Sequence, residues 1–396
     1  MTAAAQLVWV AAAADDRGPE VAAGDEAHLR RALALAERGR LTVRPNPMVG
    51  CVLVRDGVVV GEGWHERAGG PHAEIVALNA ARERAHGATA YITLEPCAHH
   101  GRTGPCADAL IHAGVARVVY ALDDPNRRAR GGAERLRAAG VEVSGGLLAD
   151  EARQQNEAFV HVHRTGRPFV TLKLAQTLDG RVAARDGSSR WITSPQARCA
   201  VHELRARMDA VMVGSGTVLA DNPALTVRHV QAPPVPPRPV MLDARGRIPA
   251  DAAAARRGAI AVTTRRSEPK WRHALAERGV EVLVVAPAAG GGVDLAAALQ
   301  ACAERGVQAV LAEGGPTVAG ALVRASLVDR LVLHVAPTLI GGDGVSSLAG
   351  AGAPSLVEGW AWTLDCVDRL GPDLVIVASP QSTSTPGFAA AADTSA

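Results

Sequence analysis

The sequence predicts two α/β domains in one soluble chain. At 396 residues the chain is longer than one ordinary domain core requires and long enough for two. Apolar runs with the length of strands alternate with helical patterns along most of it, which is typical of sheets covered by helices on both faces. Around residues 151–166 the pattern turns polar and ends in Thr165-Gly166-Arg167-Pro168, which indicates a connector between the domains.

The connector and the composition of the two ends divide the chain into four segments. Residues 1–24 are rich in alanine and predict a frayed extension, whose apolar patch is too short to span a bilayer. Residues 25–166 form the predicted first domain, and residues 167–379 form the second. Residues 380–396 consist mostly of serine, threonine, alanine and glycine, a composition typical of a disordered tail.

The composition narrows the class of function. Hydrophobic residues make up 48% of the chain and charged residues 21%, which is the balance of a soluble globular protein with no membrane segment. The formal net charge is only +2 and the arginines are spread over both halves, so a nucleic acid is not an expected partner, whereas a small phosphorylated ligand fits. The six cysteines lack the spacing of a disulfide framework, which favours the reducing cytoplasm.

Helix and strand signals follow one another closely in the first domain. Asp25 can cap an opening helix that ends near Gly39. The apolar runs 48–54 and 58–60 are joined through Asp56-Gly57, a dipeptide suited to a tight hairpin turn. The elements expected next are a helix at 73–84, a strand at 89–94, a helix at 107–113 and a strand at 115–122.

The second domain shows strand-like runs separated by polar or helical segments. The segment from Pro233 to Pro239 carries Pro-Pro-Val-Pro-Pro and predicts an exposed loop. The predicted strands lie at 169–174, 210–213, 239–242, 259–262, 280–285, 309–311, 330–335 and 374–377.

Three potential metal ligands stand out in the first domain. His72 lies in Pro71-His72-Ala73-Glu74, Cys97 follows Glu95-Pro96, and Cys106 follows Pro105. Zinc prefers imidazole and thiolate donors, and a hydrolytic zinc site uses three protein ligands and leaves one position for water. Each of the three residues sits where a predicted helix or strand begins or ends, so that three elements can converge on one ion. The sequence therefore predicts one zinc ion per chain.

Glu74 follows His72 by two residues, which places it near the predicted metal without obliging it to bind. A histidine, a non-ligating glutamate and two cysteines, one of them after a proline, form the pattern of zinc deaminases that act on nucleobase rings. In that chemistry a carboxylate carries the two protons of the activated water in successive steps, one to the ring nitrogen and one to the departing ammonia. The pattern thus predicts a hydrolytic deaminase with Glu74 as the catalytic proton carrier.

Two other interpretations of these ligands remain open from the residues alone. The site could be a structural zinc knot, in which His99 or His100 completes a set of four ligands. It could also hold no metal and simply bury two cysteines. The joint occurrence of the His-x-Glu triplet, Glu-Pro-Cys and a second Pro-Cys favours the catalytic interpretation.

The spacing of the two cysteines departs from the common pattern. Eight residues separate Cys97 from Cys106, where most members of the deaminase superfamily have two. This longer insert resembles that of the family of bifunctional riboflavin biosynthesis proteins known as RibD. The resemblance covers about residues 25–377, and it also rests on motifs in the same order at residues 45–50, 61–65, 69–74, 177–181, 191–194, 218–223 and 313–317.

The resemblance implies a fold, two reactions and their partners. It implies a cytidine-deaminase-like three-layer α/β/α domain followed by a dihydrofolate-reductase-like α/β domain. The first domain would use zinc to deaminate a diaminohydroxyphosphoribosylaminopyrimidine to the corresponding uracil. The second would use NADPH to reduce the ribosyl chain of 5-amino-6-(5-phosphoribosylamino)uracil to a ribityl chain. We also expect a homo-oligomer that binds these small molecules.

The matching positions imply that the pyrimidine contacts Asn46, His65, His99 and Arg102. An asparagine offers both a donor and an acceptor to a ring edge, and a histidine and an arginine can bind a phosphate. An ordinary surface histidine is the alternative for His65 and for His99. One loop departs from the family: after Asn126 the family usually continues with proline, whereas this chain reads Arg-Arg-Ala-Arg-Gly-Gly at 127–132. Contacts from that loop are therefore not assigned.

In the second domain a predicted strand runs into Glu313-Gly314-Gly315-Pro316-Thr317 and then into a helix. A glycine-rich turn at the start of a helix lets backbone N–H groups approach a phosphate closely, although a plain strand-to-helix connection is equally compatible. The turn is not the dinucleotide fingerprint with three spaced glycines. The resemblance decides in favour of NADPH binding at this turn.

The resemblance also assigns residues of the second domain to its two ligands. The implied NADPH contacts are Ala175, Trp191, Thr217, Asp221, Gly315, Pro316, Thr317, Val318, Ala319 and Gly320. The implied substrate contacts are Lys173, Ser189, Arg205, Leu225, Arg228 and Glu313. Two arginines suit a phosphate held by forked hydrogen bonds. Asp179 is a further candidate near the reacting ribose.

Two other functions fit the sequence less well than a bifunctional deaminase and reductase. A deaminase of nucleic-acid bases would need a basic groove and stacking aromatic residues, but aromatic residues make up only 3% of the chain and the second half would have no role. A zinc-stabilised binding module would unfold when a chelator removes the metal, whereas a hydrolytic enzyme would be inactivated.

Overall fold

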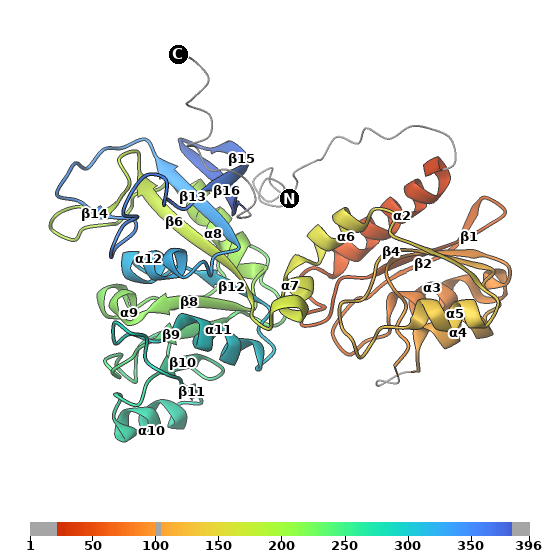
Figure 1. Cartoon of the computed structure of the whole chain (residues 1–396), viewed down its shortest axis with the longest axis horizontal. Helices are drawn as coiled ribbons and strands as arrows, with labels where there is room; N and C mark the ends of the chain where they lie inside the picture. The colour runs from red at the N-terminus through yellow and green to blue at the C-terminus, as the bar shows by residue number, and fades with distance from the viewer. Residues whose placement is uncertain (1–21, 100–103, 382–396) are drawn as a thin grey trace, which may run out of the picture. The chain divides into compact units, whose positions relative to one another are not determined.

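The computed structural model describes residues 22–99 and 104–381. The predicted extension up to residue 21, Arg102 and the tail beyond residue 381 lie outside the described residues. The chain divides into two compact units between Gly166 and Arg167 (Figure 1). Each unit has a sheet and a hydrophobic core of its own.

A five-stranded mixed sheet forms the middle of the first unit. Its strands are β1 (Gly50–Arg55), β2 (Val58–Trp64), β3 (Thr89–Leu94), β4 (Arg117–Leu122) and β5 (Glu142–Gly145), in the spatial order β2-β1-β3-β4-β5. Strand β1 pairs antiparallel with β2 and β3, whereas β3, β4 and β5 run parallel. The predicted hairpin is confirmed, and its turn residues Asp56 and Gly57 both have positive φ (52° and 74°), as a tight two-residue turn requires.

Helices cover both faces of this sheet, as predicted for a three-layer domain (Figure 1). Alternate strand residues feed two cores, with Leu53 and Ile92 on one face and Val52 and Tyr91 on the other. Short 3-10 turns, η1 (Glu37–Gly39) and η2 (Arg82–Ala85), each follow a helix. The first face carries α3 (Ala73–Ala81), α4 (Cys106–His112) and α5 (Gly132–Ala138), and the second carries α2 (Ala22–Ala36), α6 (Ala149–Gln155) and α7 (Glu157–Thr165).

The structure corrects the predicted start of the first domain. Helix α2 begins at Ala22, so residues 22–24, expected in the extension, are helical, and Asp25 lies in the first turn instead of capping the helix. The Asp25 carboxylate accepts a hydrogen bond from Tyr91 (2.6 Å) and two from Arg117 (3.0 and 2.8 Å). The bond from Arg117 is the main reason why the pKa of Asp25 lies below its usual value. A local capping pattern cannot reveal this tertiary contact.

The polar stretch predicted as a connector is helical. Helices α6 and α7 occupy most of residues 149–165, and Gly166, in the left-handed conformation (φ 76°), ends the second of them. Phe159 and Val160 of α7 are buried in the same core as α2. The outward faces of these helices are polar and dominate the local composition, which is why the stretch resembles a linker.

Close packing of α3 against β2 fixes where this helix begins. A Cβ atom at Gly61 would lie 2.4 Å from the Ala77 carbonyl oxygen, and one at Gly63 would lie 2.5 Å from that of Ala73. Because a Cβ atom cannot approach a backbone oxygen this closely, only glycine fits at both positions. The first turn of α3, which directly follows His72, therefore rests on the β2 backbone.

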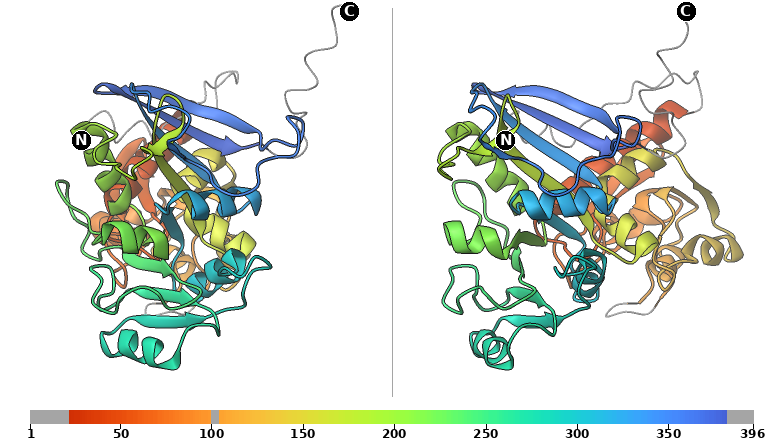
Figure 2. Two further views of the ribbon diagram at one scale, coloured as in Figure 1. Left: turned by 90° about the vertical axis from the view of Figure 1, so that its left-hand side faces the viewer. Right: turned by 60° about the vertical axis from the view of Figure 1, so that its left-hand side comes forward.

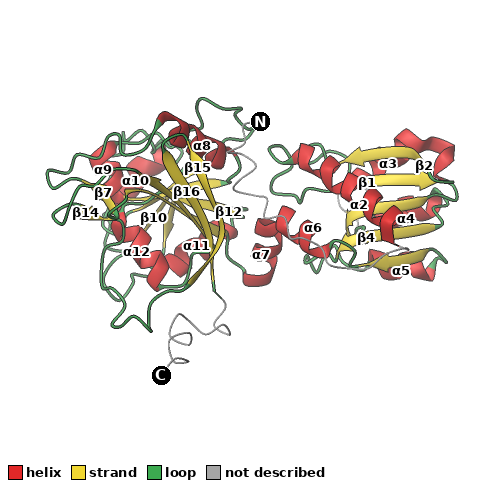
Figure 3. Cartoon of the chain, turned by 90° about the horizontal axis from the view of Figure 1, so that it is seen from above, coloured by secondary structure: helices red, strands yellow, loops and turns green. Residues whose placement is uncertain are grey.

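A nine-stranded sheet forms the second unit (Figure 3). Its strands are β6 (Phe169–Thr177), β8 (Ala210–Gly214), β9 (Arg238–Leu242), β10 (Ile260–Thr263), β11 (Glu281–Val284), β12 (Ala309–Ala312), β13 (Arg330–Ala336), β15 (Trp362–Leu370) and β16 (Asp373–Pro380). The spatial order is β11-β10-β9-β8-β12-β6-β13-β16-β15. All neighbours from β11 to β13 run parallel, whereas β16 is antiparallel to β13 and to β15.

Every predicted strand of the second unit is confirmed, but three strands were missed. Strands β7 (Arg181–Ala183) and β14 (Val345–Ser346) form a separate short ribbon. Strand β15 lies beside β16 at the edge of the large sheet (Figure 2) and exposes side chains on both faces, so its sequence lacks an apolar alternation. Strand β16 includes Pro380, one residue of the predicted tail, and β9 begins at Arg238, which was predicted in the exposed loop.

Helices pack on both faces of the large sheet. They are α8 (Pro195–Ala206), α9 (Ser215–Asp221), α10 (Pro269–Glu277), α11 (Leu295–Ala303) and α12 (Pro316–Arg324). Helices α11 and α12 share one core with Leu172 of β6, and α9 and α10 share another with Met241 of β9. Within the described residues, the chain has no helix of the length and apolarity needed to cross a membrane.

Gly63→Ala is expected to destabilise the first unit. The added methyl group would collide with the Ala73 carbonyl oxygen, and overpacking of this kind typically costs about 1–3 kcal/mol of unfolding free energy. Gly24→Ala in α2 is the matched control, because a Cβ atom there meets nothing within 4 Å. Chemical denaturation of the two variants measures the difference, and equal stability would contradict the packing argument.

Candidate functional site

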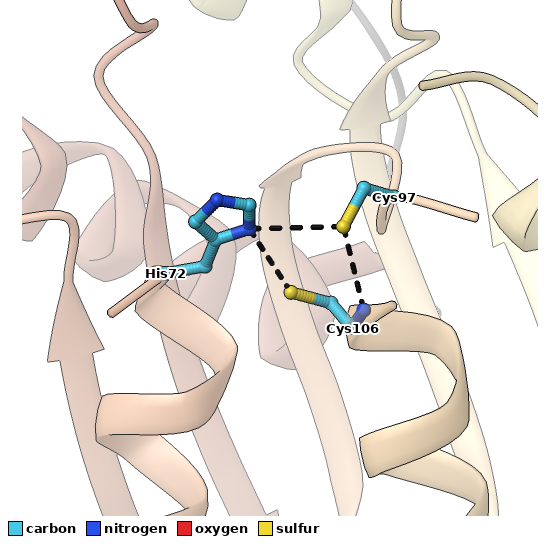
Figure 4. A group of neighbouring side chains, drawn as sticks. All are labelled: His72, Cys97 and Cys106. Carbon is cyan, nitrogen blue, oxygen red and sulfur yellow. Dashed lines mark hydrogen bonds between the residues drawn. The ribbon is translucent and has the colours of Figure 1, made fainter. Parts of the chain in front are cut away.

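The three predicted metal ligands come together at one edge of the first unit's sheet. His72 is the residue before α3, Cys97 follows β3, and Cys106 is the first residue of α4. The Nδ1 atom of His72 lies 3.2 Å from Sγ of Cys106 and 3.7 Å from Sγ of Cys97. Figure 4 shows the imidazole and both thiols pointing toward one another, and all three donor atoms lie within 4.8 Å of each other.

This donor set fits a zinc ion. Both cysteines are buried, and the hydrogen bond from Cys106 lowers the pKa of Cys97 to about 4, while the same pairing raises the pKa of Cys106. The hydrogen bond to Cys97 likewise raises the pKa of His72. The cluster therefore already favours one thiolate, and a divalent cation would supply the positive charge that a second thiolate needs.

The structural-knot alternative receives no support from the described residues. Among them, no fourth histidine, cysteine or carboxylate joins the cluster. His99 is exposed, and His100 lies outside the part of the chain that the structure describes. Among the described residues the cluster therefore has three protein ligands, the number that a hydrolytic zinc site uses.

Glu74 lies in the first turn of α3 and is only 3% exposed. Burial raises the pKa of its carboxyl group, and the neighbouring His72 partly opposes this shift. A carboxyl group whose pKa is shifted upward can both accept and release a proton at moderate pH. The carboxyl group of Glu74 is thus placed beside the metal ligands in the environment that a proton carrier needs.

Glu95 is a buried residue of this site whose role the sequence did not assign. Its carboxylate accepts hydrogen bonds from the backbone N–H groups of Asp124 (3.3 Å), Gly131 (3.0 Å) and Ala133 (3.2 Å). Glu95 therefore fixes the loop at 124–133 and does not belong to the donor cluster. Its place directly before Pro96-Cys97 was the available signal, but only the fold shows what it binds.

The loop at 127–132, which departs from the family pattern, keeps its contact with the metal site. Ala129 is buried in one cluster with Cys97 and Cys106, and its carbonyl oxygen accepts a hydrogen bond from Ala98 N (2.9 Å). A Cβ atom at Gly132 would lie 1.8 Å from the Pro96 carbonyl oxygen, so only glycine fits there. The altered loop is thus packed against the segment that carries Cys97.

Asn46 and His65, both predicted to contact the pyrimidine, are bonded to each other. His65 is 3% exposed, and its Nδ1 donates to the Pro71 carbonyl oxygen (2.9 Å), which leaves Nε2 to accept from Asn46 Nδ2 (3.0 Å). Burial lowers the pKa of His65, in keeping with a neutral ring. Both ring nitrogens of His65 are thus hydrogen-bonded within the protein, whereas the Asn46 carboxamide oxygen has no partner among the described residues.

The two predicted phosphate contacts of the first unit differ in what the structure shows of them. His99 is exposed close after Cys97, as a phosphate contact at the mouth of the site requires. Arg102 lies outside the described residues.

A second polar cluster lies on one face of the large sheet, at the carboxyl ends of three parallel strands. Lys173 of β6, Glu313 after β12 and His334 of β13 share the face opposite the core that contains Leu172. Burial lowers the pKa of Lys173 in spite of the nearby Glu313. Such an edge is where α/β sheets commonly bind ligands.

Arg205, which was predicted to contact the substrate, is paired with Glu313. Its Nε and Nη2 bind the Glu313 carboxylate (2.6 and 2.9 Å), and its Nη1 donates to the Thr226 carbonyl oxygen (3.0 Å). Burial alone would raise the pKa of Glu313, but Arg205 holds it below its usual value. A buried forked pair of this kind fixes both side chains, so that Arg205 orients Glu313.

Arg228 is the other arginine predicted at the phosphate. Its backbone N–H donates to His202 Nδ1 (3.2 Å), and its guanidinium has no hydrogen-bond or ion-pair partner among the described residues. Burial is the main reason why the pKa of His202 falls to about 4, so this ring is a neutral acceptor. The loop is thus anchored through its backbone, which leaves the Arg228 side chain for a ligand.

His334 is a residue that the sequence analysis missed. It is 2% exposed, its Nδ1 has no hydrogen-bond partner in the described chain, and burial lowers its pKa to about 3. It lies opposite Ala175 in the pairing of β13 with β6. One histidine within the apolar run Arg-Leu-Val-Leu-His-Val-Ala was the only signal, and the sheet register is needed to place it.

Two of the predicted NADPH contacts are joined at the first turns of α9 and α12, whereas Ala175 lies in β6, Trp191 lies before α8 and Asp221 ends α9. Thr217 accepts a hydrogen bond from Gly315 N (3.0 Å), which joins the two helix starts. Trp191 is 70% exposed, with Arg198 stacked on its ring (4.4 Å), and Asp221 pairs with Arg190 (3.0 Å). An exposed aromatic ring and a pair of joined helix starts are both features that suit a dinucleotide.

Not all of the predicted glycine-rich turn can touch a ligand directly. Gly315 precedes α12, Pro316 begins it, and Thr317 is exposed, whereas Val318 packs toward the core and Ala319 is fully buried. A Cβ atom at Gly320 would lie 2.1 Å from the Ala349 carbonyl oxygen, so this glycine serves close packing. Leu225 is buried at positive φ (52°), and Ser189 is half-buried.

Comparisons with known proteins agree with both halves of the chain. The family model described as "Cytidine and deoxycytidylate deaminase zinc-binding region" matches residues 23–122, and the one described as "RibD C-terminal domain" matches residues 168–376. "Riboflavin biosynthesis protein RibD" of Escherichia coli is 44% identical over 366 residues, which cover 89% of this chain and 98% of that protein. The protein of the same name from Mycobacterium tuberculosis is 43% identical over 338 residues, which cover 85% and 91%.

Solved structures give the same result. Acinetobacter baumannii RibD (form 1) is 39% identical, covers 91% of this chain and 99% of its own, and superimposes with a TM-score of 0.83. A Thermotoga maritima structure titled as a diaminohydroxyphosphoribosylaminopyrimidine deaminase/5-amino-6-(5-phosphoribosylamino)uracil reductase is 32% identical, covers 90% of this chain and 99% of its own, and has a TM-score of 0.77.

Cys106→Ser is expected to remove most of the zinc from the first unit, because a serine hydroxyl is a poor substitute for a thiolate donor. Metal analysis of the purified protein should find one zinc per chain before the substitution and far less after it. Cys366→Ser is the control, since this half-buried thiol lies outside the cluster. Undiminished zinc in Cys106→Ser would exclude this cysteine as a ligand.

Proposed function

This chain belongs to the RibD family of riboflavin biosynthesis enzymes, and we propose that its residues divide the family's two reactions as follows. The chain is a bifunctional enzyme with a cytidine-deaminase-like zinc-binding domain and a dihydrofolate-reductase-like RibD domain. The first would deaminate the phosphoribosylated diaminopyrimidine named for the Thermotoga maritima relative, and the second would reduce the resulting phosphoribosylaminouracil with NADPH.

One observation carries the deaminase assignment. His72, Cys97 and Cys106 bring three soft donors within 4.8 Å of one another, and the buried Glu74 stands in the first turn of α3 beside them. A zinc ion held there would supply a water of lowered pKa, roughly 7 instead of 15.7. Glu74 would take one proton from that water and pass it to the ring nitrogen, and would then pass the second proton of the water to the amino group, which leaves as ammonia. Asn46, held by His65, offers its carboxamide oxygen to the ring edge.

In the reductase, the chain's own residues orient the ribose and the cofactor. NADPH, when bound, supplies the hydride for the sugar carbon. The Thr217–Gly315 bond and the exposed ring of Trp191 support placing the cofactor at the starts of α9 and α12. Arg205 holds Glu313 ionised toward the substrate, while Lys173, with its lowered pKa, stands on the same face beside the reacting ribose. Arg228 supplies the charge for the phosphate.

The proposal also covers the location of the enzyme in the cell and its oligomeric state. We place the enzyme in the cytoplasm, which is supported by six free thiols and no disulfide. We also propose a homo-oligomer. Strand β15 is at the end of the nine-strand order, and it exposes Leu364 (63%) and Val367 (53%), so that apolar surface is available there for a second copy.

The direct test is incubation of the purified protein with the diaminopyrimidine substrate, with and without NADPH, and identification of the products by mass. Without NADPH the deaminated uracil should accumulate, and with NADPH the ribityl product should form. No consumption of the pyrimidine by zinc-loaded protein would refute the deaminase assignment, and uracil that stays unreduced with NADPH present would refute the reductase assignment.

Glu74→Gln is expected to lower the deamination rate by about a hundred- to ten-thousand-fold, because an amide cannot carry the proton. Zinc content and reduction of added uracil should remain as in the parent protein. Rate measurements with each substrate separately, together with metal analysis, distinguish the outcomes. A normal deamination rate would make Glu74 a bystander, and loss of zinc would make it a ligand.

Arg228→Ala is expected to impair only the reductase. Loss of a charge-assisted hydrogen bond costs about 1.5–3 kcal/mol, which corresponds to roughly ten- to a hundred-fold in kcat/KM for the uracil substrate. In a coupled assay the deaminated uracil should then accumulate at an unchanged rate of formation. Equal loss of both activities in folded protein would show that one site serves both reactions.

A further inference from the structure

A buried asparagine holds the backbone of the segment that carries Asn46. Asn156 lies between α6 and α7 and is 4% exposed. Its carboxamide oxygen accepts a hydrogen bond from Met48 N (2.8 Å), and its carboxamide nitrogen donates to the Met48 carbonyl oxygen (2.9 Å). Both polar groups of one side chain thus satisfy both polar groups of one distant residue.

This bond pair limits where Asn46 can lie. Asn46 is two residues before Met48, and its own N–H donates to the Val43 carbonyl oxygen (2.9 Å). Val43 and Met48 are buried together with Ala36 of α2, so the turn is anchored on both sides of Asn46. Without Asn156, the anchor at Met48 would lose both of its hydrogen bonds to that side chain and would retain only its apolar contacts.

The same segment is linked to the metal ligands through side chains. Asn46 Nδ2 donates to His65 Nε2 (3.0 Å), and His65 Nδ1 donates to the carbonyl oxygen of Pro71 (2.9 Å), the residue before His72. A continuous series of contacts therefore runs from Asn156 through the Asn46 segment to the first metal ligand. Displacement at Met48 would shift the Asn46 carboxamide relative to the metal ligands, because only the Val43 turn and the bond to His65 would remain to hold it.

We propose that Asn156 is a positioning residue of the deaminase, which holds the Asn46 carboxamide in the position where it can contact the pyrimidine ring. This inference rests on the proposed contact between Asn46 and the substrate. This proposal gives the junction of α6 and α7 a role in the first reaction, although these helices lie far from the metal-binding motifs in the sequence. Misplacement of a binding group by about 1 Å can cost up to roughly a hundred-fold in rate.

The first experiment compares Asn156→Ala with Gln155→Ala in the full-length, zinc-loaded protein. Gln155 is the adjacent residue, and its Nε2 donates to the Leu33 carbonyl oxygen (2.9 Å) of α2, so it ties the same helix end without touching the Asn46 segment. Asn156→Ala should lower kcat/KM for the pyrimidine by about ten- to a hundred-fold, mainly through KM. Gln155→Ala should leave kcat/KM unchanged, and both should keep their zinc and their reductase activity.

Asn156→Asp provides a second variant if the alanine variant does not fold. It keeps the acceptor for Met48 N and loses the donor to the Met48 carbonyl oxygen, and the same rise in KM is expected. A normal KM in folded Asn156→Ala or Asn156→Asp would overturn the proposal. So would an equal loss of deaminase efficiency in Gln155→Ala, since the effect would then come from the helix junction in general.

The second experiment separates this inference from the proposed function on which it rests. Asn46→Ala alone tests the substrate contact, and an unchanged KM would remove that contact and the positioning role with it. If Asn46→Ala raises KM, the double variant decides: adding Asn156→Ala to Asn46→Ala should lower kcat/KM by no more than about two-fold further, because the group being positioned is gone. Fully multiplicative effects of the two substitutions would show that Asn156 acts elsewhere and would overturn the proposal.

Discussion

The first unit is organised around the need to bury three metal donors within 4.8 Å of one another, although they come from three separate elements. Two thiols and an imidazole this close cannot all take their metal-binding forms without a cation, because two buried thiolates repel each other. The fold meets this demand through neighbours that do not bind the metal. Glycines in β2 allow the first turn of α3 to pack against the β2 backbone. Glu95 binds backbone N–H groups of the loop at 124–133, and Glu74 is buried beside the metal donors.

The second unit also holds charged side chains close to one another, with their charges stabilised by hydrogen bonds. Glu313 and Lys173 lie together on one face of the sheet, and the forked bond from Arg205 stabilises the charge of Glu313. A buried ion pair offsets its desolvation cost only when its geometry is good and further hydrogen bonds satisfy its polar groups. Here each of the three guanidinium nitrogens of Arg205 donates one hydrogen bond, two to Glu313 and one to the Thr226 carbonyl oxygen. Arg205 is thus fixed against Glu313, whereas the guanidinium of Arg228 has no hydrogen-bond or ion-pair partner among the described residues.

The sequence predicts most of the secondary structure and the metal site, because both depend on local patterns. The Asp56-Gly57 hairpin, the eight parallel or core strands of the second unit and the ligand triad are all marked by residue types at short spacing. Elements without such marks escaped prediction. Strand β15 exposes both faces, and α6 and α7 present polar faces that resemble a linker, so their structure depends on partners distant in the sequence.

Within the sites, a residue's type indicates that it is polar and important, but not whether it faces the ligand or another residue. Asp25 bonds to Arg117, His65 to Asn46, and Arg205 to Glu313, although each was expected to cap a helix or to bind a substrate. In each case the partner lies 19 or more positions away along the chain. Where one member of such a pair has all its polar atoms satisfied within the protein, its partner keeps an atom that the described residues do not bond. The buried His65 and the less buried Asn46 show this division most directly, because the single ring orientation that satisfies Pro71 also fixes which carboxamide atom remains free.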